Sequence, residues 1–179
     1  MVMTRAVAWG QALGWPDLCG AEHRVSLAAD PNVSAVIARS LQLEHLASLE
    51  ADLTLRPWLD GVEIDGRVVA RMTRLCGVSL EPFDVEIDEP MRIRVVPAGS
   101  PSAPDINDGE VVIDLDAEDP PDEATGSTVD LSAYVVEALA LALDPFPRKP
   151  GAVFTPPEDA VSLSPFAALS RLAARTAED

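Results

Sequence analysis

Four side chains of the sequence could bind a metal or act as nucleophile and base: Cys19, Cys76, His23 and His45. Cys19 and His23 stand four residues apart, but structural zinc takes four ligands, usually in close pairs, and no second pair lies near them. Nucleophilic catalysis needs a base that a third group orients. We expect His45 within a helix and Cys76 as a buried, inert thiol in an apolar setting at the end of a strand. The sequence therefore predicts no catalytic residue, no metal site and no cofactor.

Paired carboxylates suggest a second kind of chemistry in residues 98–126. Asp114 and Asp116 would point the same way from one strand, and two carboxylates with a substrate phosphate can hold Mg²⁺. An enzyme that cuts RNA would also need basic groups, and this stretch contains nine acids but no lysine or arginine. We interpret the stretch as a mobile, solvated acidic loop with one short strand over 111–115. A metal-dependent RNA-processing enzyme stays as an alternative.

Five arginines gather in the part of the chain that should form a sheet: Arg67, Arg71, Arg74, Arg92 and Arg94. By the period of a strand, Arg92 and Arg94 share one face. Platforms for single-stranded RNA interleave such charges with aromatic rings, and the predicted strands offer only Trp58 and Phe83. We interpret the arginines as ordinary solvent-facing charges among acids.

The composition bounds the class of protein. With 179 residues, of which 47% are apolar, the chain can bury one ordinary core. Thirty acids against thirteen bases give a net charge of −17, which opposes broad contact with RNA and favours a basic partner or no charged partner. No targeting segment is visible, and the longest apolar run, Leu139 to Leu143, is far shorter than the ~20 residues of a membrane span. The two distant cysteines favour a reduced cytoplasmic setting, with one disulfide left open.

Alternation and turn residues predict a β-meander. A strand over 23–28 leads to a helix that starts at Asp30-Pro31 and runs to about residue 47. The turns are Asp60-Gly61, Asp65-Gly66 and Asp88 to Pro90. Because the loops are short, the strands should be antiparallel over 49–58, 62–64, 68–75, 83–87 and 91–96.

The domain organisation follows from these elements and from a second, apolar helix over 130–143. We predict an α+β fold: a single domain in which an antiparallel β-sheet meander packs against two helices, with an acidic loop and a C-terminal helical tail. Residues 1–20 should form an N-terminal arm and residues 21–154 the domain. Residues 155–179 should form the tail, with a short helix from Ser164-Pro165.

Two stretches carry recognisable motifs. Residues 66–83 end in Cys-x-x-x-Leu-Glu-Pro-Phe, formed by Cys76, Leu80, Glu81, Pro82 and Phe83. Residues 129–154 contain a helix start, Leu-Asp-Pro and Pro-Arg-x-Pro-Gly-Ala, with Asp130, Asp144, Pro145, Arg148, Pro150 and Gly151. Together they resemble the YceD family, the large ribosomal RNA subunit accumulation proteins. The resemblance spans about residues 22–154.

The resemblance implies a role in the accumulation or processing of large-subunit ribosomal RNA, with no catalytic residue to carry over. Many relatives look richer in paired cysteines, which suggests a metal site in them, and this chain keeps only Cys76 of that pattern. The favoured hypothesis is a non-enzymatic factor that binds a ribosomal protein or a pre-50S particle, with RNA contact indirect or local. The alternatives are the RNA-processing enzyme and an acidic chaperone for a basic ribosomal protein. We expect no membrane and no small-molecule substrate.

Under the favoured hypothesis, the acidic loop steers a basic partner. Rim charges act mainly on the rate of association, and they need no fixed geometry to do so. The candidate steering residues are Asp116, Glu118, Asp119, Asp122 and Glu123.

Overall fold

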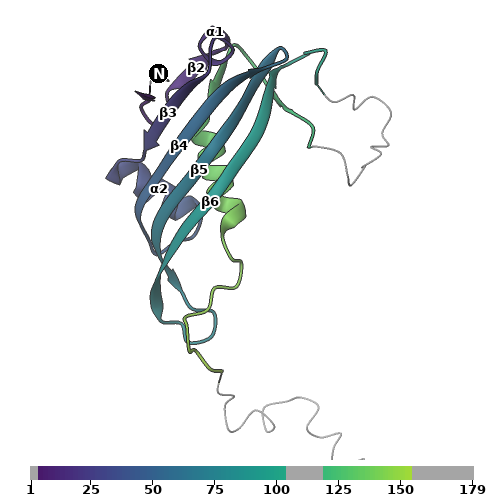
Figure 1. The fold of residues 1–179 in the computed structure, drawn as a ribbon. Coiled ribbons are helices and arrows are strands. Elements are labelled where there is room, and N and C mark those ends of the chain that lie inside the picture. Colours follow the sequence, from purple (N-terminus) through teal and green to yellow (C-terminus); the bar gives the residue numbers. More distant parts are fainter. Residues whose placement is uncertain (1–3, 104–118, 155–179) are drawn as a thin grey trace, which may run out of the picture.

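The computed structural model describes residues 4–103 and 119–154, and Figure 1 shows the order of their elements. The strands are β1 (Thr4–Ala6), β2 (Ala12–Gly14), β3 (His23–Ala28), β4 (His45–Trp58), β5 (Gly61–Leu75), β6 (Pro82–Pro97), β7 (Asp122–Ala124) and β8 (Thr128–Asp130). The helices are α1 (Trp15–Leu18), α2 (Pro31–Ser40) and α3 (Leu131–Ala142). The predicted strand over 111–115 and the predicted tail helix lie outside the described residues.

The body of the protein is a six-stranded sheet with the order β1-β3-β4-β5-β6-β7. Its four central strands, β3 to β6, are antiparallel neighbours in sequence order. Short loops join β4 to β5 and β5 to β6, as predicted, whereas α2 lies between β3 and β4. The edge strands β1 and β7 run parallel to β3 and β6, so the sheet is mixed rather than wholly antiparallel. The predicted α+β class is confirmed, and the parallel edges arise because segments distant in sequence add to the meander.

The central strands are longer than predicted. The turn predicted at Asp65-Gly66 is wrong, because both residues lie inside β5. A Cβ on Gly66 would come within 2.1 Å of the carbonyl oxygen of Asp52 on β4, so glycine is needed here for close approach of two backbones. Asp88 to Pro90 likewise continues β6, whereas the Asp60-Gly61 turn between β4 and β5 is confirmed.

The first long helix, α2, begins as predicted but ends earlier. The Asp30 side chain caps it by accepting hydrogen bonds from the backbone N–H groups of Asn32 (2.8 Å) and Val33 (2.9 Å). The helix ends at Ser40, and His45 is the exposed first residue of β4 rather than part of a helix. Pairing of β4 with β5 from His45 onward overrides the helical spacing of the leucines.

Both long helices pack on the same face of the sheet. Figure 1 shows α3 behind β5 and β6, and its Leu131, Val135 and Leu139 are fully buried in one core with Ile37 of α2. Asp130 caps α3 by accepting a hydrogen bond from the N–H of Ser132 at 2.9 Å. The prediction that the sheet packs against this apolar helix is confirmed.

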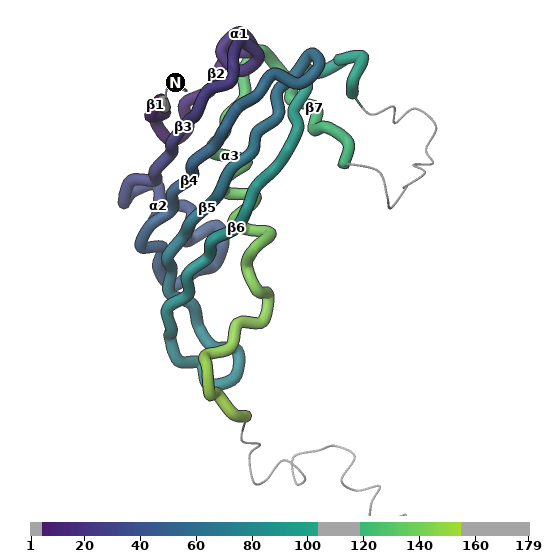
Figure 2. The backbone as a smooth tube through the Cα atoms, viewed as in Figure 1, coloured from purple at the N-terminus to yellow at the C-terminus, as the bar shows by residue number. Residues whose placement is uncertain are grey.

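The first twenty residues, expected as an arm, contribute to the body where the structure describes them. Figure 2 shows β1 beside β3, and β2 pairs with β8 just before α3. Val7, Leu13 and Leu18 are buried in the core cluster. Residues 4–20 therefore close one edge of the sheet and tie the start of α3 to the N-terminal segment.

Candidate functional site

The face of the sheet opposite α3 carries four of the five predicted arginines, Arg67, Arg71, Arg92 and Arg94, whereas Arg74 occupies an even-numbered position of β5 and donates a hydrogen bond to the segment after α3. Successive residues of a strand alternate between the two faces, so the buried even-numbered positions of β5, such as Val68 and Ala70, leave the odd-numbered arginines on the solvent side. Arg67 forms an ion pair with Asp88 at 2.7 Å, and Arg71 approaches Glu86 at 3.5 Å. The expectation of solvent-facing charges among acids thus describes these residues correctly.

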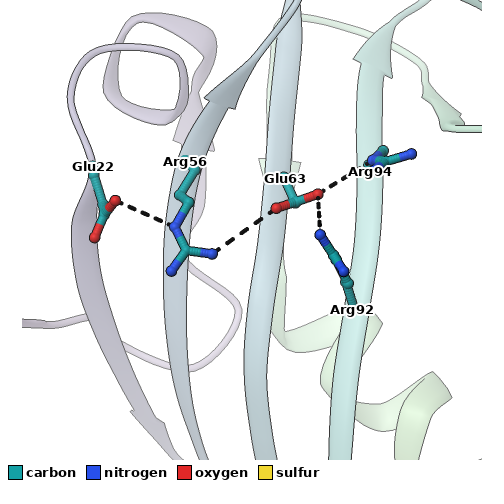
Figure 3. Close-up of polar contacts among 5 residues, drawn as sticks. All are labelled: Glu22, Arg56, Glu63, Arg92 and Arg94. Atoms are coloured by element: carbon teal, nitrogen blue, oxygen red, sulfur yellow. Dashed lines mark hydrogen bonds and ion pairs between the residues drawn. The ribbon is translucent and has the colours of Figure 1, made fainter.

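One carboxylate, Glu63, organises the charges at the end of this face (Figure 3). Its Oε2 accepts hydrogen bonds from Arg92 (3.1 Å) and Arg94 (3.2 Å) on β6, and its Oε1 lies 3.9 Å from Arg56 on β4. Arg56 in turn contacts Glu22 at 3.2 Å. We call these five residues the Glu63 network.

Register and period explain the Glu63 network. Glu63 pairs directly with Arg56 on one neighbouring strand and with Arg94 on the other, and Arg92 lies two residues along on the same face. Only 8% of Glu63 is exposed, and the Arg94 guanidinium also lies 4.9 Å from the centroid of the Trp58 ring. Sequence reasoning noticed both β6 arginines but missed the buried glutamate, whose signal is its place across from arginines on both sides.

A second cluster surrounds Cys76, just after β5. Its sulfur accepts hydrogen bonds from the backbone N–H groups of Val78 (3.4 Å), Ser79 (3.4 Å) and Lys149 (3.3 Å). The Cys76 N–H donates to the carbonyl of Glu81 at 2.9 Å, which closes the turn between β5 and β6. This tight turn and the segment that reaches it from α3 form the tip of the long β5–β6 hairpin.

The setting of Cys76 is buried but polar. The Ser79 hydroxyl, followed by the Ser79 and Lys149 backbone amides, lowers the pKa of the Cys76 thiol to about 6, although burial alone would raise it. The expected burial of this thiol is confirmed, since it is 0% exposed. The expected apolar setting is wrong, because backbone amides converge on the sulfur as they do in an anion-binding nest.

The two motif stretches meet at this tip. Gly77 donates to the carbonyl of Pro147 at 2.8 Å, and the Lys149 ammonium forms an ion pair with Glu81 at 2.9 Å. Farther back, a guanidinium nitrogen of Arg74 donates to the carbonyl of Asp144 at 2.5 Å. In Figure 2 the segment after α3 runs down to the tip, so residues about 70 apart in sequence build one surface.

Most other motif residues shape this surface or stand on it. Asp144 accepts a hydrogen bond from the N–H of Phe146 at 2.8 Å, and Leu80 (φ 59) and Gly151 (φ 78) adopt left-handed turns. Leu80 and Phe146 are 75% and 78% exposed. Pro82 and Phe83 begin β6, while Pro145, Arg148 and Pro150 lie exposed in the returning segment.

A comparison with known protein families matches residues 64–172 to the family described as large ribosomal RNA subunit accumulation protein YceD. The match covers more than half of the chain. The chain belongs to the YceD family. No curated protein and no solved structure matches it. The matched range contains both motif stretches, the β6 arginines of the Glu63 network and the whole hairpin tip.

The remaining candidate ligands of this YceD-family chain have other partners. Cys19 donates to the carbonyl of Gly61 at 3.3 Å, and burial, with the nearby charge of Asp60, raises the pKa of its thiol. His23 Nδ1 lies 2.9 Å from the carbonyl of Ala21. Within residues 4–103 and 119–154, no three histidine, cysteine or acidic side chains cluster as metal ligands would. None of the described helices has the length and apolarity to cross a membrane.

The acidic steering residues are only partly within the described residues. Asp116 and Glu118 lie outside them, as does the magnesium candidate Asp114. Asp122 begins β7, and the Glu123 carboxylate accepts a hydrogen bond from the N–H of Gly99 at 2.6 Å. Asp119 lies exposed at the start of this part. Where the acidic stretch is described, it thus returns to the sheet as a parallel edge strand.

Proposed function

We propose that the chain is a non-enzymatic factor that supports accumulation or processing of large-subunit ribosomal RNA by binding a ribosomal protein or a pre-50S particle. The observation that carries this proposal is the YceD-family match over residues 64–172. Such a role places the chain in the cytoplasm, where ribosomes are assembled.

Charge supports protein contact over broad RNA contact. A net charge of −17 repels phosphate, and wide RNA binding draws most of its affinity from phosphate neutralisation. The guanidiniums on the solvent face of the sheet are largely matched with carboxylates. Arg92, which is 62% exposed at the edge of the Glu63 network, offers a local contact with RNA. RNA is therefore affected indirectly or touched at one place.

The non-enzymatic part of the proposal rests on what the reactive groups contact. The Cys76 sulfur is buried against backbone amides with no histidine among its hydrogen-bond partners. Glu63 is committed to arginines. The alternative of a metal-dependent RNA-processing enzyme rests on Asp114 and Asp116, which lie outside the described residues.

Co-purification tests the proposal. The chain, tagged at one end and expressed in cells that lack the untagged copy, is captured at low salt, and the bound RNA and proteins are identified. We expect precursors of the large subunit or basic ribosomal proteins to be enriched over an unrelated tagged acidic protein. Depletion should lower the ratio of large- to small-subunit ribosomal RNA. Cleavage of precursor RNA by the purified chain with Mg²⁺, lost in Asp114→Asn, would instead establish the enzyme.

A further inference from the structure

The long strand β6 leaves most of one edge unpaired. β7 pairs with it only over Val95–Pro97, and across the described residues no strand covers the side of β6 that runs from Pro82 to Arg94. Pro90 lies within this stretch, and a proline is tolerated in a strand where its missing N–H would face an open edge. An open edge is a template for another extended chain.

A groove of about 650 Å³ opens between this edge and α3. Its walls combine apolar side chains, among them Met91 and Leu141, with the carboxylates of Glu89, Asp122 and Glu137. Leu141 is 81% exposed although it is a leucine on a helix whose other face is core. Exposed apolar surface rimmed by charge is typical of an interaction site.

The three groove carboxylates form no ion pair within the described part of the chain, although the charge of Glu89 acts on Arg67, which is itself paired with Asp88. Among the described residues, no ion pair or side-chain hydrogen bond engages Glu89, Asp122 or Glu137, whereas the acids on the opposite face of β6 pair with arginines of β5. The one base in the groove wall, Arg92, is held by Glu63. Burial and the charges of Asp122 and Glu137 raise the pKa of the Tyr134 hydroxyl in the wall, as a negative local potential requires.

We propose that this groove binds an extended basic segment of a protein partner, in which lysine or arginine side chains alternate with apolar ones. The inference rests on the proposed function and narrows its partner to a protein with such a segment. The basic side chains reach Glu89, Asp122 and Glu137, and an apolar side chain covers Leu141. Because Pro90 removes one edge donor, side chains contribute more to recognition than in a full strand addition.

Charge also decides against other occupants. An RNA strand would bring phosphates to the three groove carboxylates, and a second copy of this chain would bring a surface of the same net negative sign. A basic segment gains from the same field both in affinity and in its rate of association. The partner class follows from this complementarity.

A peptide that carries these features serves as the probe. We would use a fluorescein-labelled peptide of about ten residues, the length of a long strand, in which lysine alternates with valine. Its controls are the same peptide with glutamate for lysine and the same peptide with proline for valine. Binding to the full-length chain is measured by fluorescence anisotropy over a range of salt concentrations. Sedimentation of the chain and binding of a labelled uridine oligonucleotide are measured beside it.

The protein variants are matched in charge. Glu89→Gln with Glu137→Gln removes two groove carboxylates, and Glu44→Gln with Glu50→Gln removes two exposed carboxylates near α2 and β4. We expect the groove variant to raise the Kd of the lysine peptide about tenfold and to flatten its salt dependence, since each rim charge contributes modestly. The matched variant should change the Kd less than about twofold. Equal circular dichroism spectra and melting temperatures establish that both variants fold.

Each outcome decides the inference separately from the proposed function. Equal Kd values for the two variants, or equal binding of the glutamate peptide, overturn the groove as a basic-segment site. Binding of the oligonucleotide in its place, or a dimer that the groove variant dissociates, overturns it in favour of RNA or a second copy. If tagged groove variant captures large-subunit particles as well as the parent does, the inference fails while the proposed function stands. If the parent captures none, the proposed function fails whatever the peptide shows.

Discussion

Two leucines of α3, one buried and one exposed, allow a direct test of where the core lies. Leu139 is 0% exposed in the core cluster, whereas Leu141, two residues on, is 81% exposed. Replacing each with alanine removes the same atoms from the same helix and changes helix propensity equally, so the difference between the two variants reports burial alone.

The structure sets the magnitude of the expected difference. A fully buried leucine lost to alanine costs transfer free energy plus a cavity, about 3 kcal/mol in total. For Leu141→Ala we expect the free energy of unfolding to fall by less than about 0.5 kcal/mol, because this exposed side chain buries little apolar area on folding. Leu139→Asp should go further and unfold the domain, since it places an unpaired charge against Leu131 and Val135, at a cost of several kcal/mol.

Urea unfolding followed by tryptophan fluorescence and by circular dichroism measures both free energies of unfolding. About 3 kcal/mol is a large part of the roughly 5 to 15 kcal/mol that stabilises a domain, so Leu139→Ala should shift the midpoint clearly to lower urea. Equal midpoints for Leu139→Ala and Leu141→Ala would refute the packing of α3 on the sheet. So would a normal melt for Leu139→Asp.

Three further predictions concern charge. Glu63→Gln should lower the free energy of unfolding by roughly 1 to 2 kcal/mol, because its nearly buried side chain would no longer carry the charge that pairs with the surrounding arginines. Glu86→Gln, which affects an exposed ion pair, should change the free energy of unfolding little. Urea unfolding measures both. Because the pKa of Cys76 is lowered, its thiolate stabilises the fold fully above the unfolded value of 9.0, and this stabilisation is lost as pH falls through about 6. The difference in free energy of unfolding between the parent and Cys76→Ala should therefore grow from acid to alkaline pH. A difference that does not change with pH contradicts the assignment. Neutralising the steering residues should slow particle association in proportion to the number changed. An all-or-none loss from one residue would instead indicate a metal ligand. The residues to change are Asp116, Glu118, Asp119, Asp122 and Glu123.

Local signals in the sequence predicted the elements that local chemistry determines. Asp30 and Asp130 cap their helices as predicted, because a carboxylate that accepts from the next N–H groups needs nothing from the rest of the fold. Asp65-Gly66 misled the prediction because glycine serves two purposes. At Gly66 it allows close approach to the backbone of β4, and only the pairing of two strands reveals this.

The candidate site depended on contacts that no local pattern contains. The two motif stretches were identified separately, yet the bond from the Lys149 N–H to the Cys76 sulfur spans 73 positions of sequence. The Glu63 network likewise needs the register of three strands before Arg56 and Arg94 flank one carboxylate. His45 likewise belongs to β4, because its pairing with β5 outweighs the helical spacing of the neighbouring leucines.

The fold sorts the charges of this chain into two groups with different consequences. On the solvent face of the sheet, acids of β6 lie across from arginines of β5, so their fields cancel within a few ångströms, well inside the screening length of about 8 Å at physiological salt. Among the described residues, the groove acids Asp122 and Glu137 have no such arginine across from them, and Glu89 lies near Arg67, whose guanidinium is already ion-paired with Asp88. Part of the uncancelled negative charge thus lies at the β6 edge and on the β7 strand beside it. The basic segment that we propose as partner would be drawn to that edge before it makes any contact, and strand pairing and apolar contact at Leu141 would then act at short range.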